Sequence, residues 1–198
     1  LHHAPAIAGA DDNGYWAQGS RLAESGRTWF RVESPAQFVG FHWLRTADDR
    51  WVSRYPPGLA VAVGAVWAVA GAEAATWLNP ALALATLAGV FLLARRIVSP
   101  GWAVLAAGWL AASPAFTTQA LWCFAHMAVA CALVWSLVLL PRALAGSVTA
   151  TAAVGLLAGA LPALRYPEGL LWLLIGAHGL RTAWGKPVAW RLGAAFAA

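Results

Sequence analysis

Two adjacent carboxylates, Asp11 and Asp12, open a polar stretch of this sequence and could perform acid–base chemistry. A carboxylate can accept the proton of an attacking hydroxyl group, as the general base of a transfer reaction. The alternative is structural, because an aspartate at the start of a helix caps free N–H groups of the first turn. Both interpretations predict a short helix over residues 11–26.

Arg165 and Glu168 form a second pair of ionisable side chains, at the boundary of an apolar run. Because they lie three residues apart, they can form a salt bridge that anchors a helix end. Ionisable groups at membrane depth are costly and usually have a function. The planar guanidinium of Arg165 would also suit a phosphate group.

His126 is a further polar side chain within an apolar run, residues 121–140, and is expected about two turns from the outer end of that run. It could hydrogen-bond a neighbouring helix or contact a substrate. The sequence shows no zinc-type Cys/His spacing, no phosphate-binding glycine loop and no nucleophile elbow. It therefore predicts no cofactor and no metal ligands, with a divalent metal left open.

The composition predicts an integral membrane protein. Only 11% of the 198 residues are charged, 61% are hydrophobic, and the mean hydropathy is +0.63. A soluble domain carries about 25% charged residues, so this chain could not cover its surface with them. The net charge of +5 comes mainly from arginines in short loops. That pattern indicates membrane orientation rather than a nucleic-acid partner.

The elements that must position these residues belong to one transmembrane domain, residues 1–198, expected to be truncated at both ends. Residues 11–57 form a polar first loop, expected outside the cytoplasm. Residues 58–72 form an apolar segment that is short for a crossing, which needs about 20 residues, so we expect a juxtamembrane or re-entrant helix. Residues 77–198 hold transmembrane helices.

Within the polar loop, residues 41–46 and 50–55 have the pattern of two strands joined by a turn. Asp48 and Asp49 lie at the turn, where aspartate tolerates the left-handed conformation, so turn formation explains this second acidic pair. The pattern predicts a short β-hairpin that ends at Tyr55-Pro56-Pro57-Gly58.

Proline and arginine residues punctuate the rest of the chain. Ser113-Pro114 and Pro162 are expected to break helices, and the stretch before residue 11 is expected to be the exit of an earlier helix. The apolar runs cover residues 77–98, 101–112, 121–140, 148–164 and 169–180, and a last run begins near residue 192.

The arginines predict an orientation in the bilayer. The positive-inside rule places Arg95-Arg96, Arg142 and the group from Arg181 to Arg191 in the cytoplasm. If the 58–72 helix does not cross, alternation of the spans places the polar loop on the opposite side. One extracytoplasmic pocket would then receive Asp11, Asp12, Gln119, Arg165 and Glu168.

Four motifs in this order resemble the GT-C membrane glycosyltransferases. They are the acidic pair in the form D-D-x-x-Y-x₆-L-x₃-G, the Arg54-Tyr55-Pro56-Pro57-Gly58 segment, the Ser113-Pro114 break and Arg165-Tyr166-Pro167-Glu168-Gly169. The branch that the sequence resembles holds the protein O-mannosyltransferases and the lipid A aminoarabinose transferases, a family 39-like group. The resemblance covers nearly the whole chain, as the N-terminal part of such an enzyme.

This resemblance implies an all-α polytopic membrane enzyme, with juxtamembrane helices and a possible β-hairpin in its first extracytoplasmic loop. It would move a sugar from a polyprenyl-phosphate donor to an extracytoplasmic protein, lipid or glycan, usually with inversion, in the bacterial inner or plasma membrane. The acceptor-side carboxylate would be Asp11, with Asp12 beside it, and Arg165 would bind the donor phosphate. The implied substrate pocket also holds Tyr15, Tyr55, His126 and Glu168.

A departure from the family concerns His126, because many relatives have an acidic residue early in that span. Any metal or charge role tied to that acid is in doubt here. The competing class is a non-enzymatic polytopic membrane protein, either a transporter or a scaffold of an envelope complex. Broken helices fit a transporter, although transporters usually bury charge near the bilayer midplane, whereas these charges gather beside a large polar loop.

Overall fold

The computed structural model describes residues 10–34, 40, 42–184 and 194, and 76% of the model is helical. The helical prediction is therefore confirmed, whereas the possible hairpin belongs to a small sheet. The α-helices are α1 (Ala10–Ser25), α2 (Gly58–Thr76), α3 (Leu78–Ala94), α4 (Pro100–Ala112), α5 (Pro114–Leu121), α6 (Ala125–Leu144), α7 (Val148–Leu164) and α8 (Gly169–Ala183), with a 3₁₀ turn, η1 (Tyr166–Glu168), before α8.

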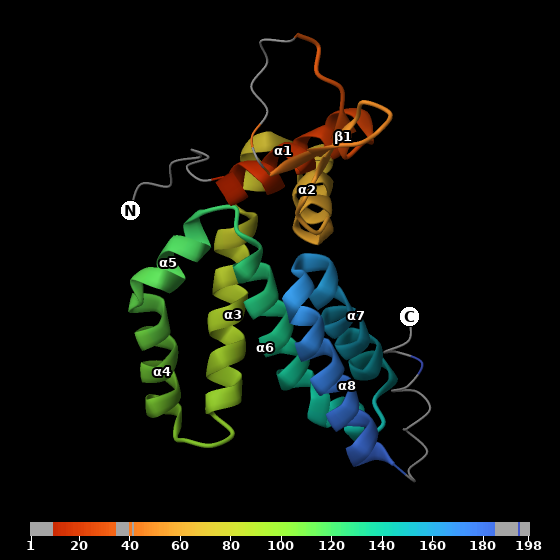
Figure 1. Cartoon of the computed structure of the whole chain (residues 1–198). Helices are drawn as coiled ribbons and strands as arrows, with labels where there is room; N and C mark the ends of the chain where they lie inside the picture. Colours follow the sequence, from red (N-terminus) through yellow and green to blue (C-terminus); the bar gives the residue numbers. More distant parts are fainter. Residues whose placement is uncertain (1–9, 35–39, 41, 185–193, 195–198) are drawn as a thin grey trace.

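Helices α3, α4, α6, α7 and α8 run along one another as a bundle, and α1, α2 and the strands gather at one end of it (Figure 1). Helix α6 is central because it packs on both α3 and α7, while α4 packs on α3 and α8 packs on α7. Helices α3 and α6 run in parallel, since Asn79 in the first turn of α3 contacts Phe124 just before α6, and Arg96 beyond the end of α3 contacts Val138 in the second half of α6. Because the two helices are parallel, α6 starts at the end of the bundle where α1 lies.

By length and composition, α2 and α6 could each cross a membrane, and α3, α4 and α7 are apolar but shorter. Helix α2 continues to Thr76, beyond the predicted segment 58–72, although its backbone leaves helical geometry at Gly71, with φ 88° and ψ 170°. Because α2 packs mainly on α1 and meets α3 and α7 over few residues, it lies across the end of the bundle (Figure 1). That it does not cross the bilayer stays a prediction.

A close crossing of glycines joins α1 to α2. A Cβ atom at Gly19 would lie 2.6 Å from Cγ1 of Val63, and one at Gly64 would lie 2.9 Å from the carbonyl oxygen of Gly19. Side chains at these positions would push the two helices apart, since packed cores do not absorb added atoms without strain. The glycines therefore set how closely α1 approaches α2.

A three-stranded antiparallel sheet follows α1, in the order β1 (Trp29–Phe30), β3 (Trp51–Ser53), β2 (Trp43–Arg45). The predicted hairpin is confirmed, because Trp43 pairs with Ser53 and Arg45 with Trp51 around the turn. The turn prediction for the second acidic pair is confirmed too: Asp49 has φ 63°. Its backbone N–H donates to the Thr46 carbonyl at 3.1 Å.

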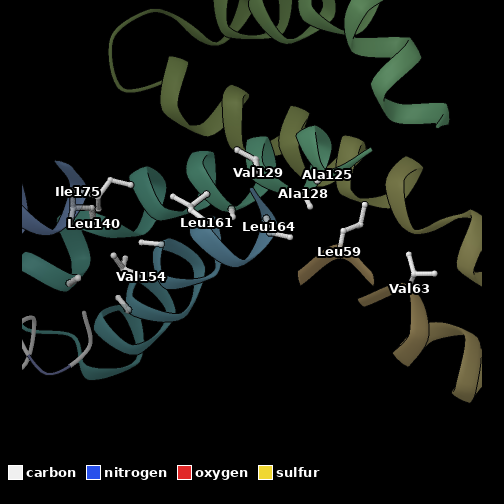
Figure 2. Close-up of a cluster of buried hydrophobic side chains, with 14 of the residues drawn as sticks. Leu59, Val63, Ala125, Ala128, Val129, Leu140, Val154, Leu161, Leu164 and Ile175 are labelled. Carbon is white, nitrogen blue, oxygen red and sulfur yellow. The ribbon is translucent and has the colours of Figure 1, made fainter. Parts of the chain in front are cut away.

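The hydrophobic core lies where α2, α6, α7 and α8 meet (Figure 2). Leu59 and Val63 of α2 approach it from the α1 end, and Val154 and Leu161 of α7 lie fully buried within it. Gly58 allows the start of α2 to rest on α7, because a Cβ there would lie 2.6 Å from the Ala163 carbonyl oxygen. Through this core, α2 packs on the helices of the bundle.

The predicted break at Ser113-Pro114 is confirmed, because Ser113 is extended between α4 and α5. The predicted continuous run 121–140 is wrong at both ends. Trp122 and Phe124 are extended, so α6 begins at Ala125 and continues through Pro141 to Leu144. Pro162 also lies inside α7, in its last turn, rather than breaking it.

Arg96, beyond the end of α3, covers carbonyl groups of α6 near its C-terminus. Its Nη1 donates to the Leu137 oxygen at 3.3 Å and its Nη2 to the Val138 oxygen at 2.5 Å. Pro141 has no N–H to offer the Leu137 carbonyl, so the arginine replaces the missing helical donor. Arg96, Arg142 and Arg181, which the orientation rule grouped together, therefore lie at the bundle end opposite α1. Lys186 and Arg191 of the same group lie outside the described residues.

Candidate active site

A cavity of about 180 Å³ lies at the α1 end of the bundle. Four segments that are distant in the sequence supply its lining: the first turns of α1, the Arg54-Tyr55-Pro56 segment, the start of α6 and the Arg165-Tyr166-Pro167 segment after α7. Each contributes where a helix begins or ends, so the cavity is positioned by helix termini. Its lining residues are Asp11, Tyr15, Arg54, Tyr55, Pro56, Phe124, His126, Arg165, Tyr166 and Pro167.

Tyr55 orients the carboxylate of Asp11. Its phenolic hydroxyl donates a hydrogen bond to Asp11 Oδ1, and its ring packs on Tyr15 with centroids 4.9 Å apart. Gly14 makes this approach possible, because a Cβ there would lie 2.6 Å from the Tyr55 ring. Burial raises the pKa of the Tyr55 phenol, and the hydrogen bond to Asp11 raises it further, so Tyr55 stays a donor near neutral pH.

Tyr15 lines the cavity together with Asp11 and Arg165. Burial raises its pKa to about 12, Arg165 opposes that rise, and Asp11 adds to it. Such opposing influences on one phenol mean that Asp11 and Arg165 both act across the space that Tyr15 occupies. The cavity therefore has an acidic side at the start of α1 and a basic side after α7.

Arg165 lines the cavity and pairs with Glu168 outside its lining. The Arg165 Nη1 to Glu168 Oε1 distance is 2.6 Å, so the salt bridge expected from their spacing is present. The other carboxylate oxygen of Glu168, Oε2, is buried and has no hydrogen-bond partner among the described residues. The ion pair with Glu168 therefore places the Arg165 guanidinium at the cavity edge.

Asp12 points away from the cavity, although it follows Asp11 directly. Its side chain is 2% exposed, and its Oδ1 accepts a hydrogen bond from the backbone N–H of Cys123 at 2.7 Å. Neighbours on a helix are about 100° apart around the axis, so one aspartate can face the cavity while the other enters the protein. The adjacent carboxylates thus lie in different surroundings.

His126 lies in the first turn of α6 and lines the cavity. The expectation that it lies two turns inside the helix is wrong, because the helix begins later than the apolar run does. Its ring meets that of Phe124 edge to face, with centroids 6.1 Å apart. These two rings form part of the cavity wall.

Several cavity residues were not singled out from the sequence. Arg54 has a sequence signal, because it is the first residue of the Arg54-Tyr55-Pro56-Pro57-Gly58 motif. Phe124 had none, because an aromatic residue in an apolar run is ordinary. Gln119, expected in the pocket, does not line the cavity. Across residues 10–34, 40, 42–184 and 194, no three His, Cys, Asp or Glu side chains are grouped to hold a metal ion.

This arrangement can bind a small ligand with one anionic and one hydroxylic part. Asp11 could accept a proton from a hydroxyl group, and Arg165 could stabilise negative charge on a phosphate. His42 lies near Asp11 as a buried ring, and burial lowers its pKa while Asp11 partly opposes that effect. Neutral His42 therefore adds no cation to the acidic side.

The comparisons with known proteins add no relative: no family model, no curated protein and no solved structure matches this chain.

Proposed function

We propose that this protein is a membrane glycosyltransferase that moves a sugar from a polyprenyl-phosphate donor to an extracytoplasmic acceptor. The observation that carries the proposal is that Asp11 and Arg165, which lie far apart in the sequence, line one cavity. A transfer from a lipid phosphate needs a base for the acceptor and a cation for the leaving group. Both groups are present within reach of one small ligand.

In the proposed reaction, the acceptor hydroxyl oxygen attacks the anomeric carbon of the donor sugar. Its proton passes to the Asp11 carboxylate, which Tyr55 orients through its hydrogen bond. The bond between the anomeric carbon and the phosphate oxygen breaks, and the electron pair leaves with the polyprenyl phosphate. The guanidinium of Arg165 stabilises that charge. One displacement from the opposite face inverts the anomeric centre.

The membrane placement is part of the proposal. Helices α3, α4, α6, α7 and α8 would lie in the bilayer, and α1, α2 and the sheet would lie at its extracytoplasmic surface. Its support is that exposed side chains of α4 include Trp102, Val104, Leu105 and Trp109, which would contact lipid. The arginines at the far end would face the cytoplasm.

The position of the charges favours an enzyme over a transporter. The cavity is lined by helix termini, whereas a transporter binds its substrate near the middle of the spans. A lipid donor lies in the bilayer and its acceptor lies outside, so a transferase needs its charged groups at this boundary.

Transfer by the full-length protein tests the proposal. The protein is reconstituted in liposomes with radiolabelled polyprenyl-phosphate sugars, and release of free polyprenyl phosphate is measured for wild type and Asp11→Asn. The matched control is Asp49→Asn, because Asp49 is exposed in the hairpin turn and its left-handed backbone tolerates asparagine. We expect release in the wild type and control and its loss in Asp11→Asn; equal release in all three contradicts the role of Asp11.

A further inference from the structure

A break in the helices, residues Trp122 to Phe124, separates α5 from α6 beside the cavity. Both Trp122 and Phe124 have extended backbones. The Trp122 N–H still donates to the Thr118 carbonyl and the Phe124 N–H donates to the Trp122 carbonyl, which leaves the Cys123 N–H and the Phe124 carbonyl group for other partners. Buried backbone groups of this kind need other hydrogen-bond partners. The break would be unfavourable unless side chains from elsewhere satisfied it.

Two buried side chains from different helices supply those partners. Asp12 of α1 accepts from the Cys123 N–H at 2.7 Å. Asn79 of α3 donates through Nδ2 to the Phe124 carbonyl at 2.9 Å and also to the Trp122 carbonyl. Asp12 is 2% exposed and Asn79 4% exposed, so neither hydrogen bond competes with water.

The consequence for the cavity follows from the next residues of the chain. Phe124 ends the break and His126 lies in the first turn of α6, and both line the cavity. The Trp122, Phe124 and His126 rings contact one another in series, with centroids 5.3 Å and 6.1 Å apart. The position of this aromatic wall therefore depends on where the break is held.

We propose that Asp12 and Asn79 are positioning residues that hold the 122–124 break so that Phe124 and His126 line the same cavity as Asp11. Asp12 acts through the Cys123 N–H and does not contact substrate, while Asp11 carries the acid–base role. The inference rests on the proposed function for its kinetic consequences. It divides the acidic pair into one carboxylate for chemistry and one for structure.

Substitutions at Asp12 and Asn79 that change the charge in opposite directions distinguish a positioning role from a catalytic one. Asp12→Asn keeps an oxygen that can accept from the Cys123 N–H, although its negative charge is lost. Asn79→Asp keeps the shape, but a carboxylate cannot donate to the carbonyl groups of Trp122 and Phe124. Asp12→Ala removes the acceptor, and Asn13→Ala, at an exposed position of α1, serves as its control.

The experiment combines transfer kinetics of the full-length protein with hydrogen exchange of the peptide that contains Cys123. We expect Asp12→Asn to retain activity within about threefold, with the Cys123 amide still protected from exchange. We expect Asp12→Ala and Asn79→Asp to lower kcat/KM about tenfold or more, mainly by raising KM for the donor, with faster exchange. Asn13→Ala should match the wild type in both measurements.

Two results overturn the inference. If Asp12→Asn is as inactive as Asp11→Asn while the Cys123 amide stays protected, the charge of Asp12 is needed for the reaction itself. If Asp12→Ala keeps both activity and protection, the hydrogen bond does not hold the break. If the wild type transfers no sugar, the proposed function fails instead, and exchange together with binding of undecaprenyl phosphate alone still decides whether these residues hold the wall.

Discussion

The phenolic hydroxyl of Tyr55 donates a hydrogen bond to the Asp11 carboxylate, and this contact joins the end of the polar loop to the first turn of α1. It bridges 44 residues of sequence. Burial and the carboxylate together raise the pKa of Tyr55, so the hydrogen bond persists over the usual range of assay pH. The orientation of the proposed base is therefore set by a residue outside its own helix.

The Tyr55→Phe substitution removes this hydrogen bond while keeping the ring that packs on Tyr15. A hydrogen bond to a charged group contributes about 1.5–3 kcal/mol, so we expect kcat to fall about 10- to 100-fold. Initial rates of polyprenyl-phosphate release give kcat, and the melting temperature in detergent checks that the fold is kept. An unchanged kcat would mean that Tyr55 does not orient the base.

Replacement of Arg165 by glutamine should raise the KM for the lipid-phosphate donor. The substitution removes the cation that faces the cavity and leaves the partly buried Glu168 without its ion-pair partner. Arg142→Gln is the matched control, since Arg142 is exposed in the last turn of α6, at the other end of the bundle. Donor titrations of both variants measure the effect; an equal KM in the two would argue against phosphate binding by Arg165.

The glycine crossing between α1 and α2 should not accept a methyl group at Gly64. A Cβ there meets the Gly19 carbonyl oxygen at 2.9 Å, so Gly64→Ala should lower the stability by about 1–3 kcal/mol. Gly108→Ala is the matched control because nothing lies within 4 Å of a Cβ at that helical position. There alanine should stabilise by about 0.5–1 kcal/mol. Thermal unfolding of both variants tests the contrast.

Stability should fall on mild acidification because of His42. Burial lowers the pKa of His42 in the folded protein, with Asp11 partly opposing, whereas the unfolded value is 6.5. Below pH 6.5 the unfolded chain therefore binds more protons than the folded one, and the free energy of unfolding declines until the folded pKa is passed. Melting temperatures between pH 7.5 and about 5 should fall less steeply for His42→Gln than for wild type. Parallel slopes for the two proteins would contradict this.

Arg96 and Pro141 should be energetically coupled. Arg96→Leu leaves the Leu137 carbonyl without a donor because Pro141 has no N–H, and we expect a loss of about 1–2 kcal/mol. In a Pro141→Ala background, the restored N–H can pair with that carbonyl group, so the same substitution should cost less. A double-mutant cycle by denaturant unfolding measures the coupling, and additive effects would show that Arg96 does not replace the missing donor.

Local signals were enough to predict elements whose ends are set by their own residues. Helix α7 runs from Val148 to Leu164, as the apolar run did, because the Ser147 side chain caps its start. The hairpin turn formed around Asp48 and Asp49 since aspartate accepts the left-handed conformation there. The expected pocket residues divide into two groups: Asp11, Tyr15, Tyr55, His126 and Arg165 line the cavity, whereas Asp12, Gln119 and Glu168 do not.

Hydrogen bonds between residues distant in the sequence occur at the features that local patterns did not predict. The run from Leu121 to Leu140 looks continuous, but it breaks at Trp122–Phe124, where Asp12 and Asn79 reach the backbone from two other helices. The hydrogen bond from the Cys123 N–H also gives Asp12 different surroundings from those of Asp11. Two identical side chains at adjacent positions give no sequence signal for this difference. Sequence alone determined an apolar helical chain with polar helix ends, since composition and periodicity are local properties. Tertiary structure decided which of those polar groups face the cavity, because that depends on partners distant in the chain.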